Sequence, residues 1–206
     1  MRAAADPAPP PPLPQPRTQN AGRKPLLAAQ RQDDVGKKTL VLDLDETLVH
    51  SSFQDVAVPH FTVPVEIENE IHEINVIRRP GLDHFMRSVG EKYEVVVFTA
   101  SLAKYANPVL DTIDRYGVVL DRLFRESCVY DRGNYIKDLS MLGRDLKDVI
   151  IIDNSSISYM YQPENAIPCS NFIDDPNDQD LFELLPLLDA LANVSDVTQA
   201  LSMRRK

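Results

Sequence analysis

The chain has 206 residues, of which 43% are hydrophobic and 26% charged, and its net charge is −9 at neutral pH. This length and composition are typical of one globular domain with a sizeable core. No apolar run approaches the ~18 residues that span a bilayer, and no secretory signal pattern opens the sequence. We therefore expect a nuclear or cytoplasmic protein without a membrane span.

The charge is unevenly distributed. Residues 1–38 contain seven Lys and Arg against three acids, a net charge of +4, which leaves −13 for residues 39–206. Nucleic-acid backbones are bound mainly by clustered Lys and Arg, so an acidic domain is a poor candidate for direct nucleic-acid binding.

The first 37 residues are predicted to form a disordered, Pro-rich, basic tail. Eight of the 16 prolines lie within the first 25 residues, where almost nothing could be buried in a core. The run from Pro9 to Pro14 could occupy an SH3- or WW-type groove, although composition favours a plain flexible tail. We place the boundary near Gly36 and the folded domain at residues 38–206.

Three short apolar runs predict the centre of a parallel sheet. Residues 39–42, 95–98 and 149–152 are mostly β-branched, as expected for strands buried on both faces. Parallel neighbours need crossover helices, which we predict from Pro80 to about Ser88 and from about Leu102 to Arg115. The fold class is α/β.

Smaller elements are predicted around this sheet. Residues 61–68 and 71–77 alternate apolar and polar side chains around the turn Asn69-Glu70, which predicts an antiparallel hairpin, and residues 128–136 predict a second. A helix capped by Asn177 or Asp178 should reach Leu188, with a kink or early end at Pro186. A short helix is expected after Ser195.

Each apolar run is followed by polar residues. Asp43 and Asp45 follow the first run, Thr99 the second, and Asp153 and Asn154 the third. The carboxyl ends of adjacent parallel strands converge on one crevice, so these groups should share a site. A Lys at position 137, after the second hairpin, would be a further member.

These residue types suit phosphoryl transfer. A carboxylate such as Asp43 can accept a phosphoryl group, and Mg²⁺ relieves the repulsion between the two anions. Suitable magnesium ligands are Asp43, the carbonyl of Asp45, and Asn154 or Asp153. Asp45 could protonate the leaving oxygen and then activate water.

Two further residues would bind the phosphoryl group. Lys137 would neutralise its charge, and Thr99 would donate a directional hydrogen bond. Taken singly, an Asp-x-Asp is usually a turn, a Lys is usually a surface charge, and a Thr after a strand is usually a local cap. The conjunction of all of them after three buried strands favours the catalytic interpretation.

The segment from Leu42 to His50 resembles the Asp-x-Asp-x-Thr signature of the haloacid-dehalogenase superfamily, in the form found in small phosphatases of the RNA polymerase II C-terminal domain. The resemblance continues through residues 98–105, 124–128, 133–140 and 153–155 and covers about Lys38 to Ser202. It implies a Rossmann-like sheet flanked by helices, with a small inserted antiparallel sheet and no large cap domain.

The resemblance also implies residue roles and a substrate class. Positions matching Asp43, Asp45 and Asn154 hold Mg²⁺, with Asp153 supporting them from behind, and positions matching Thr99 and Lys137 bind phosphate. Positions matching Phe53, Leu102 and Tyr105 form an apolar pocket that receives a substrate proline. By themselves these three would be ordinary packing residues. The implied substrate is a phosphoserine or phosphothreonine in a protein.

The sequence departs from the family pattern at one place and does not determine the branch of the family to which it belongs. The family commonly has Pro two residues after the Asn of its Asp-Asn motif, whereas this sequence has Ser156 at that position. The difference removes no metal ligand. The C-terminal part from Asp175 to Leu191 is equally close to nuclear-envelope relatives that dephosphorylate lipin.

Other functions fit parts of the pattern. A receiver domain also gathers Asp, Thr and Lys around Mg²⁺, but its phosphate acceptor lies on a mid-chain strand. A catalytically inactive phosphopeptide-binding scaffold would not require a general acid at Asp45. A phosphatase of small metabolites would be expected to carry a longer cap block.

Overall fold

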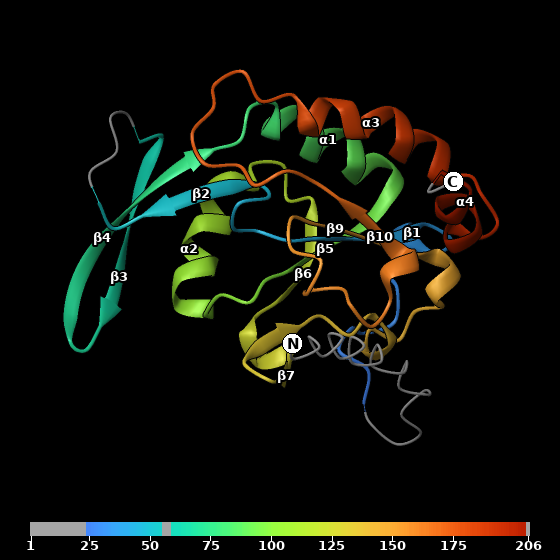
Figure 1. Cartoon of the computed structure of the whole chain (residues 1–206), viewed down its shortest axis with the longest axis horizontal. Coiled ribbons are helices and arrows are strands. Elements are labelled where there is room, and N and C mark those ends of the chain that lie inside the picture. The colour runs from blue at the N-terminus through green and yellow to red at the C-terminus, as the bar shows by residue number, and fades with distance from the viewer. Residues whose placement is uncertain (1–23, 55–58, 205–206) are drawn as a thin grey trace, which may run out of the picture.

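The computed structural model describes residues 24–54 and 59–204. Its centre is a five-stranded parallel sheet in the order β10-β9-β1-β5-β6 (Figure 1). The three apolar runs form its middle strands, as predicted. These strands are β1 (Lys38–Leu42), β5 (Tyr93–Phe98), β6 (Val119–Leu123), β9 (Val149–Asp153) and β10 (Ala166–Pro168). Within the described ranges no helix has both the length and the apolar character needed to cross a membrane.

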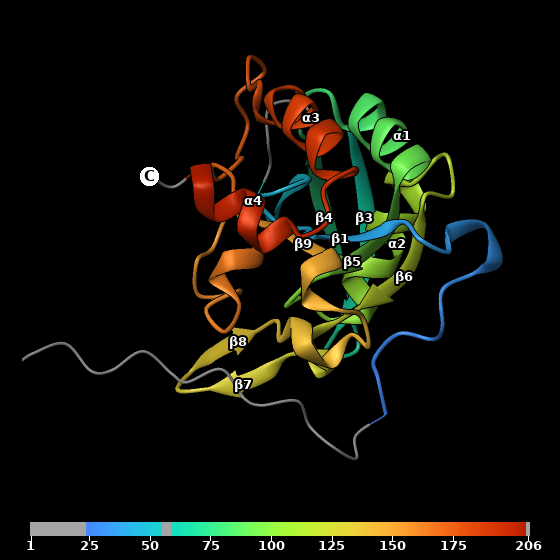
Figure 2. The same cartoon turned by 90° about the vertical axis from the view of Figure 1, so that its right-hand side faces the viewer.

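Different parts of the chain pack against the two faces of the sheet. Leu40 and Leu42 belong to a core cluster with buried residues of α1 (Leu82–Lys92), α2 (Ala103–Ile113), α3 (Asp180–Leu191) and α4 (Val197–Arg204). Val41 between them packs in the other direction, against a second cluster that includes Leu27 and Leu139. Figure 2 shows α1 and α3 side by side above the sheet and the small β7–β8 hairpin below it.

A separate antiparallel sheet, in the order β2-β4-β3, projects from the main sheet (Figure 1). It consists of β2 (Val49–Ser52), β3 (Phe61–Ile67) and β4 (Glu70–Arg78). The hairpin turn lies one residue earlier than predicted, because Glu68 and Asn69 occupy the two positions of positive φ, at 52° and 65°. Both residues belong to a two-residue turn that twists in the same sense as its strands.

The second hairpin is present and begins one residue later than predicted, at Val129. It joins β7 (Val129–Asp131) and β8 (Asn134–Ile136) through Arg132 and Gly133, which both have positive φ. Lys137 follows β8 directly, and its backbone N–H donates to the carbonyl of Ser158 at 2.7 Å. This contact fixes the position from which the Lys137 side chain enters the sheet edge.

Two predictions for α3 are wrong. The helix neither ends early at Pro186 nor stops at Leu188, but continues to Leu191. Burial of four leucines on one face offsets the hydrogen bond that a proline cannot donate. Its N-cap position is Gln179, without a side-chain cap, although the Asp178 carboxylate accepts from the N–H of Asp180 at 3.1 Å.

The contacts of the folded domain begin before the predicted boundary at residue 37. Leu27 is 4% exposed, and the N–H groups of Leu26 and Leu27 donate to the carbonyls of Met141 and Leu142. A Cβ atom placed on Gly143 would lie 2.6 Å from Cβ of Pro25, so the segment packs closely there. The predicted Pro9 to Pro14 binding run lies outside the described residues.

Candidate active site

The site lies at the carboxyl edge of the main sheet. The parallel register pairs Leu42 with Val97 on one side and with Ile152 on the other, so β1, β5 and β9 end at one level. The N–H of Asp43 donates to the carbonyl of Ile152 at 3.0 Å, which continues the ladder by one residue. Residues 43–48, the acidic loop, therefore begin at a hydrogen-bonded strand end.

Lys137 pairs with the carboxylates at the ends of two of these strands. Its ammonium lies 2.6 Å from Oδ1 of Asp43 and 2.6 Å from Oδ2 of Asp153, and the Lys137 side chain is 1% exposed. Burial disfavours the ammonium, but the two carboxylates outweigh this and raise the pKa of Lys137 to about 12. Burial raises the pKa of Asp153 to about 6, an effect that Lys137 partly offsets.

Thr47 occupies the space between Asp43 and Asn154. Its hydroxyl oxygen lies 2.8 Å from Oδ2 of Asp43 and 3.2 Å from Oδ1 of Asn154, so its single proton can serve one of them at a time. The amide Nδ2 of Asn154 donates to Oδ1 of Asn171 at 2.9 Å. Neither Thr47 nor Asn171 received a role from the sequence; for Thr47 the signal was its fixed place in Asp-x-Asp-x-Thr.

Asp45 is held toward α2. The hydroxyls of Tyr105 and Ser101 donate to its two oxygens at 2.6 and 2.7 Å, and Thr99 lies 3.4 Å away. Burial raises the pKa of Asp45 in spite of the Tyr105 and Ser101 hydrogen bonds, and the Asp43 charge adds to the increase. The Thr99 hydroxyl also accepts from the N–H of Ser101 at 3.0 Å. Thr99 is thus both a loop cap and a neighbour of Asp45.

The three predicted pocket residues come together. Phe53, Leu102 and Tyr105 line a cavity of about 270 Å³ that opens beside Asp45. The rest of the lining is Ser51, Val65, Ile67, Ile74, Ser101, Lys104 and Arg125. Sequence reasoning assigned nothing to Arg125, whose guanidinium lies 4.9 Å above the Tyr135 ring while its Nε donates to the Ala100 carbonyl at 2.6 Å.

The donor set fits Mg²⁺ in kind. Within the described ranges no three His, Cys, Asp or Glu side chains are grouped to hold a metal alone. Magnesium, however, is usually bound by one or two carboxylates together with waters and phosphate oxygens. Asp43, Asn154 and the Asp45 carbonyl supply such oxygens, whereas the Asp153 side chain is only 1% exposed and bonds to Lys137 and to the N–H of Ser155.

A larger cavity of about 1010 Å³ lies elsewhere, between the end of β4, the start of α1 and residues 172–176. Its lining includes Arg78, His84 and Pro176 but none of the carboxylates around Lys137. The smaller cavity, by contrast, is lined by Asp45, two residues after Asp43, so it is the cavity that adjoins the cluster of titratable groups.

Comparison with known proteins identifies the family of the chain. Residues 38–198 match the family model described as NLI interacting factor-like phosphatase. A Dictyostelium discoideum protein named "Probable C-terminal domain small phosphatase" is 57% identical over 91% of this chain and 61% of its own length. The human "CTD small phosphatase-like protein" is 55% identical over 80% of this chain and 59% of its own length.

The solved structures add the fold. The structure of Fcp1, an RNA polymerase II CTD phosphatase, superposes with a TM-score of 0.57 at 19% identity, covering 82% of this chain and 52% of that one. This similarity bears out the predicted α/β class with a small inserted sheet. The chain spans about three-fifths of the length of the curated relatives named above.

Proposed function

The chain belongs to the NLI interacting factor-like phosphatase family, and on this premise we propose that it hydrolyses phosphoserine or phosphothreonine esters in proteins through a covalent phosphoryl group on Asp43. One observation carries the proposal. Asp43 contacts both the buried ammonium of Lys137 and the hydroxyl of Thr47 at the end of β1, while Asp45 stands beside a separate apolar cavity.

In the first step, a carboxylate oxygen of Asp43 attacks the phosphorus atom. A bond forms between that oxygen and phosphorus, and the bond from phosphorus to the ester oxygen breaks. The leaving oxygen takes a proton from Asp45, whose raised pKa favours the protonated form. Lys137 balances the charge on the transferred group, and Thr99 donates a hydrogen bond to it.

In the second step, water attacks the phosphorylated Asp43. Asp45, now ionised, removes a proton from the water, and the bond between phosphorus and the Asp43 oxygen breaks. Inorganic phosphate leaves and both carboxyl groups return to their starting state. The Tyr105 and Ser101 hydroxyls keep the Asp45 carboxyl in place during both transfers.

Asp43, Asn154 and the carbonyl of Asp45 would hold Mg²⁺, with Asp153 fixed behind them. When bound, the ion offsets the repulsion between the attacking carboxylate and the phosphate. Thr47 and Asn171, through their hydrogen bonds, would hold the Asp43 and Asn154 side chains in place as ligands.

The apolar cavity favours a substrate with a proline near the phosphorylated residue. Phe53 is 65% exposed at the rim of this cavity, and Leu102 is 42% exposed, so both are available to a peptide. A human relative, 50% identical over 87% of this chain, is named for the C-terminal domain of RNA polymerase II. We extend that substrate type and a nuclear location to this protein as part of the proposal; a lipin-type substrate is the alternative.

The reaction is tested with a phosphopeptide panel in which each peptide is made with and without a flanking proline. We expect phosphate release that requires Mg²⁺ and stops with EDTA, and Asp43→Asn should lose turnover by several orders of magnitude. Full activity in Asp43→Asn would exclude the proposed nucleophile. Tight peptide binding by the wild-type protein without any hydrolysis would instead support the inactive scaffold.

The pocket is tested by Phe53→Ala with Tyr116→Ala as its control, because both replace an aromatic ring more than half exposed. Phe53→Ala should raise KM for the proline-containing peptide and leave the proline-free peptide unchanged, whereas Tyr116→Ala should change neither. Equal KM values for both peptides in the wild-type protein would favour the lipin-type alternative.

A further inference from the structure

Arg79 is a buried arginine behind the candidate site. It follows β4, its side chain has 0% exposure, and Pro80 after it restricts it to extended backbone. Its guanidinium donates to both oxygens of Asp178, at 2.7 and 2.8 Å, and lies 3.0 Å from an oxygen of Asp180. These two acids precede and open α3.

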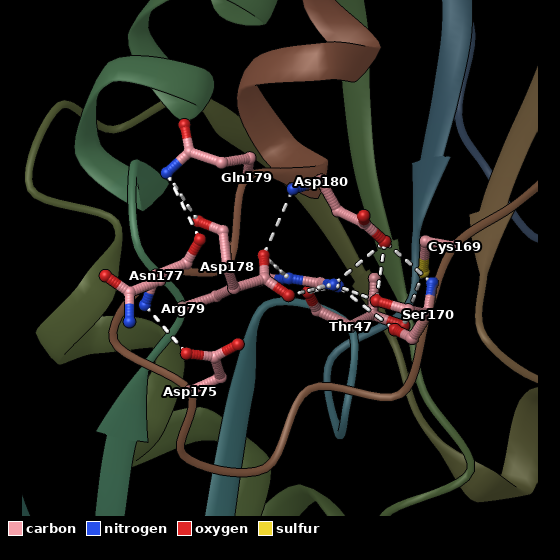
Figure 3. A network of polar contacts seen from close by, with 9 residues as sticks. All are labelled: Thr47, Arg79, Cys169, Ser170, Asp175, Asn177, Asp178, Gln179 and Asp180. Carbon is pink, nitrogen blue, oxygen red and sulfur yellow. Dashed lines mark hydrogen bonds and ion pairs between the residues drawn. The ribbon is translucent and has the colours of Figure 1, made fainter.

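The other guanidinium contacts are with loops of the site. Nη1 donates to the carbonyl of Thr47 at 3.1 Å and to that of Ser170 at 3.2 Å, and Nη2 donates to the Ser170 hydroxyl at 2.6 Å. Figure 3 shows the Arg79 guanidinium surrounded by Asp178, Asp180, Thr47 and Ser170. One guanidinium thus joins three separate segments of chain.

Each loop so joined presents a side chain to the cluster around Asp43. Thr47, held through its carbonyl, directs its hydroxyl to Asp43 and Asn154. Ser170 precedes Asn171, which accepts the Asn154 amide hydrogen and so turns the Asn154 carbonyl oxygen toward Thr47. The same loop is tied to the acidic loop a second time, because the N–H of Phe172 donates to the Glu46 carbonyl at 2.8 Å.

We propose that Arg79 is a positioning residue for the phosphatase reaction: its planar guanidinium fixes the loops of Thr47 and Asn171, and through them the oxygens of Asp43 and Asn154. The inference rests on the proposed function for its consequence in catalysis. Its structural part, the orientation of the Asn154 amide, does not depend on any reaction.

The contacts of Arg79 require the several N–H donors of a planar guanidinium, which the ammonium of a lysine cannot replace. Arg79 makes bonds in several fixed directions within one plane, to two carboxylates, two carbonyls and a hydroxyl. A lysine ammonium has three donors and no planar arrangement, so it can balance the acids without holding both loops. Arg79→Lys therefore keeps the charge and removes the alignment.

Arg144→Lys is the matched control. Arg144 also makes a two-bond fork with a buried carboxylate, that of Glu94 at 2.6 and 2.8 Å, and also binds a loop carbonyl, that of Ala28 at 2.8 Å. It lies away from the carboxylates around Lys137 and takes no part in the proposed reaction. The two variants should lose similar thermal stability.

The first readout is kinetic, with an aryl phosphate and varied Mg²⁺ at a temperature where both variants are folded. A misplacement of about 1 Å can cost on the order of 10²-fold in rate. We expect Arg79→Lys to lower kcat by roughly tenfold to a hundredfold and to raise the half-saturating Mg²⁺ concentration, with a smaller change in KM. Arg144→Lys should retain wild-type values.

The second readout is the side-chain amide signal of Asn154 in NMR spectra, recorded without substrate and during titration with Mg²⁺ alone. In Arg79→Lys this signal should move toward that of a solvated amide, and the Mg²⁺ concentration needed for half its shift should rise. Arg144→Lys should leave both unchanged. If the wild-type protein hydrolyses no phosphate ester, the proposed function fails while the NMR comparison still decides the role of Arg79.

Unchanged kcat, Mg²⁺ dependence and Asn154 signal in folded Arg79→Lys would overturn the proposal. Equal kinetic losses in both variants would also overturn it, since Arg79 would then act only through stability. If Arg79→Lys does not fold, Ser170→Ala takes its place, because it removes the two bonds of the Ser170 hydroxyl, with Arg79 at 2.6 Å and with Asp180 at 2.7 Å, and keeps the bond from Arg79 to the Ser170 carbonyl. It should shift the Asn154 signal and the Mg²⁺ dependence in the same direction by a smaller factor, and no shift would contradict the proposal.

Discussion

At the scale of single residues, the burial of the Lys137 ammonium has an energetic consequence for folding. A charged ammonium with 1% exposure is tolerated because two carboxylates surround it. Removing one member of such a cluster leaves the remaining charges buried and uncompensated. The cluster therefore contributes to folding as well as to the proposed chemistry.

Lys137→Met is accordingly expected to lower the free energy of unfolding by about 3–5 kcal/mol, measured by urea denaturation. Lys147→Met is the control, because Lys147 is 52% exposed and pairs with the exposed Asp145, an arrangement worth about 0–1 kcal/mol. A loss below about 1 kcal/mol in Lys137→Met would mean that the buried cluster is not coupled to folding.

Glu94 makes stability depend on pH. Burial disfavours its ionised form, but hydrogen bonds from Arg144, Thr39 and Gln30 outweigh this and lower its pKa below the ordinary 4.5. A lowered pKa in the folded state gives stability that is fully present above pH 4.5 and is lost as the pH falls through the folded-state value.

We therefore expect the stability difference between the wild-type protein and Glu94→Gln to be largest near neutral pH and to shrink below about pH 4.5. Thermal unfolding of both proteins between pH 3 and pH 7, roughly the range in which Glu titrates, measures this difference. A difference that stays constant across the range would show that the Glu94 charge does not contribute.

At the scale of elements, the turn of the β3–β4 hairpin contains a residue type that does not suit its backbone conformation. Glu68 and Asn69 both adopt positive φ, which suits Asn or Gly better than Glu. The comparable β7–β8 turn already has Gly133 at its second position. Hairpin register is nevertheless fixed, because Val63, Val65, Ile74 and Val76 must face the core.

The double substitution Glu68→Asn and Asn69→Gly should therefore stabilise the protein by about 0.5–1 kcal/mol by relieving the left-handed positions. Chemical denaturation measures the gain. Glu66→Asn, in the same hairpin at an exposed strand position, serves as a control that should give no gain. A loss of stability in the double variant would mean that the turn needs the present side chains.

At the scale of the whole molecule, residues 24–37 form part of the folded unit. They supply Leu27 to the cluster on one face of the sheet, and Gln30 donates to the Lys37 carbonyl and to Glu94. Burial of one leucine contributes about 1.5–3 kcal/mol. Composition suggested a tail up to residue 37 because its few apolar residues, taken alone, form no pattern.

A protein of residues 38–206 should consequently melt at a lower temperature than one of residues 24–206, by at least about 4 °C if Leu27 alone contributes about 2 kcal/mol. Leu27→Ala in the longer protein should reproduce part of the difference. Equal melting temperatures would show that the segment adds nothing to stability.

The sequence by itself determined the α/β sheet and the site at its carboxyl edge. Buried parallel strands are continuous apolar runs, and the residues that follow each run must meet where the strands end together. The positions of Asp43, Thr99 and Asn154 follow from that rule, whereas Lys137 follows a hairpin outside the parallel sheet and was included because its charge suits phosphoryl transfer. The phosphatase family came from a resemblance carried by the same residues.

Only the tertiary structure decided which side chains contact one another in and behind the site. The bond from Tyr105 to Asp45, the contact of Asn171 with Asn154, and the Arg79 links join residues 17 to 99 positions apart, which no local periodicity encodes. The continuation of α3 through Pro186 was likewise decided by leucine burial against the core rather than by backbone preference. The local sequence determines which polar side chains lie at the strand ends, and long-range packing determines how each of these side chains is oriented.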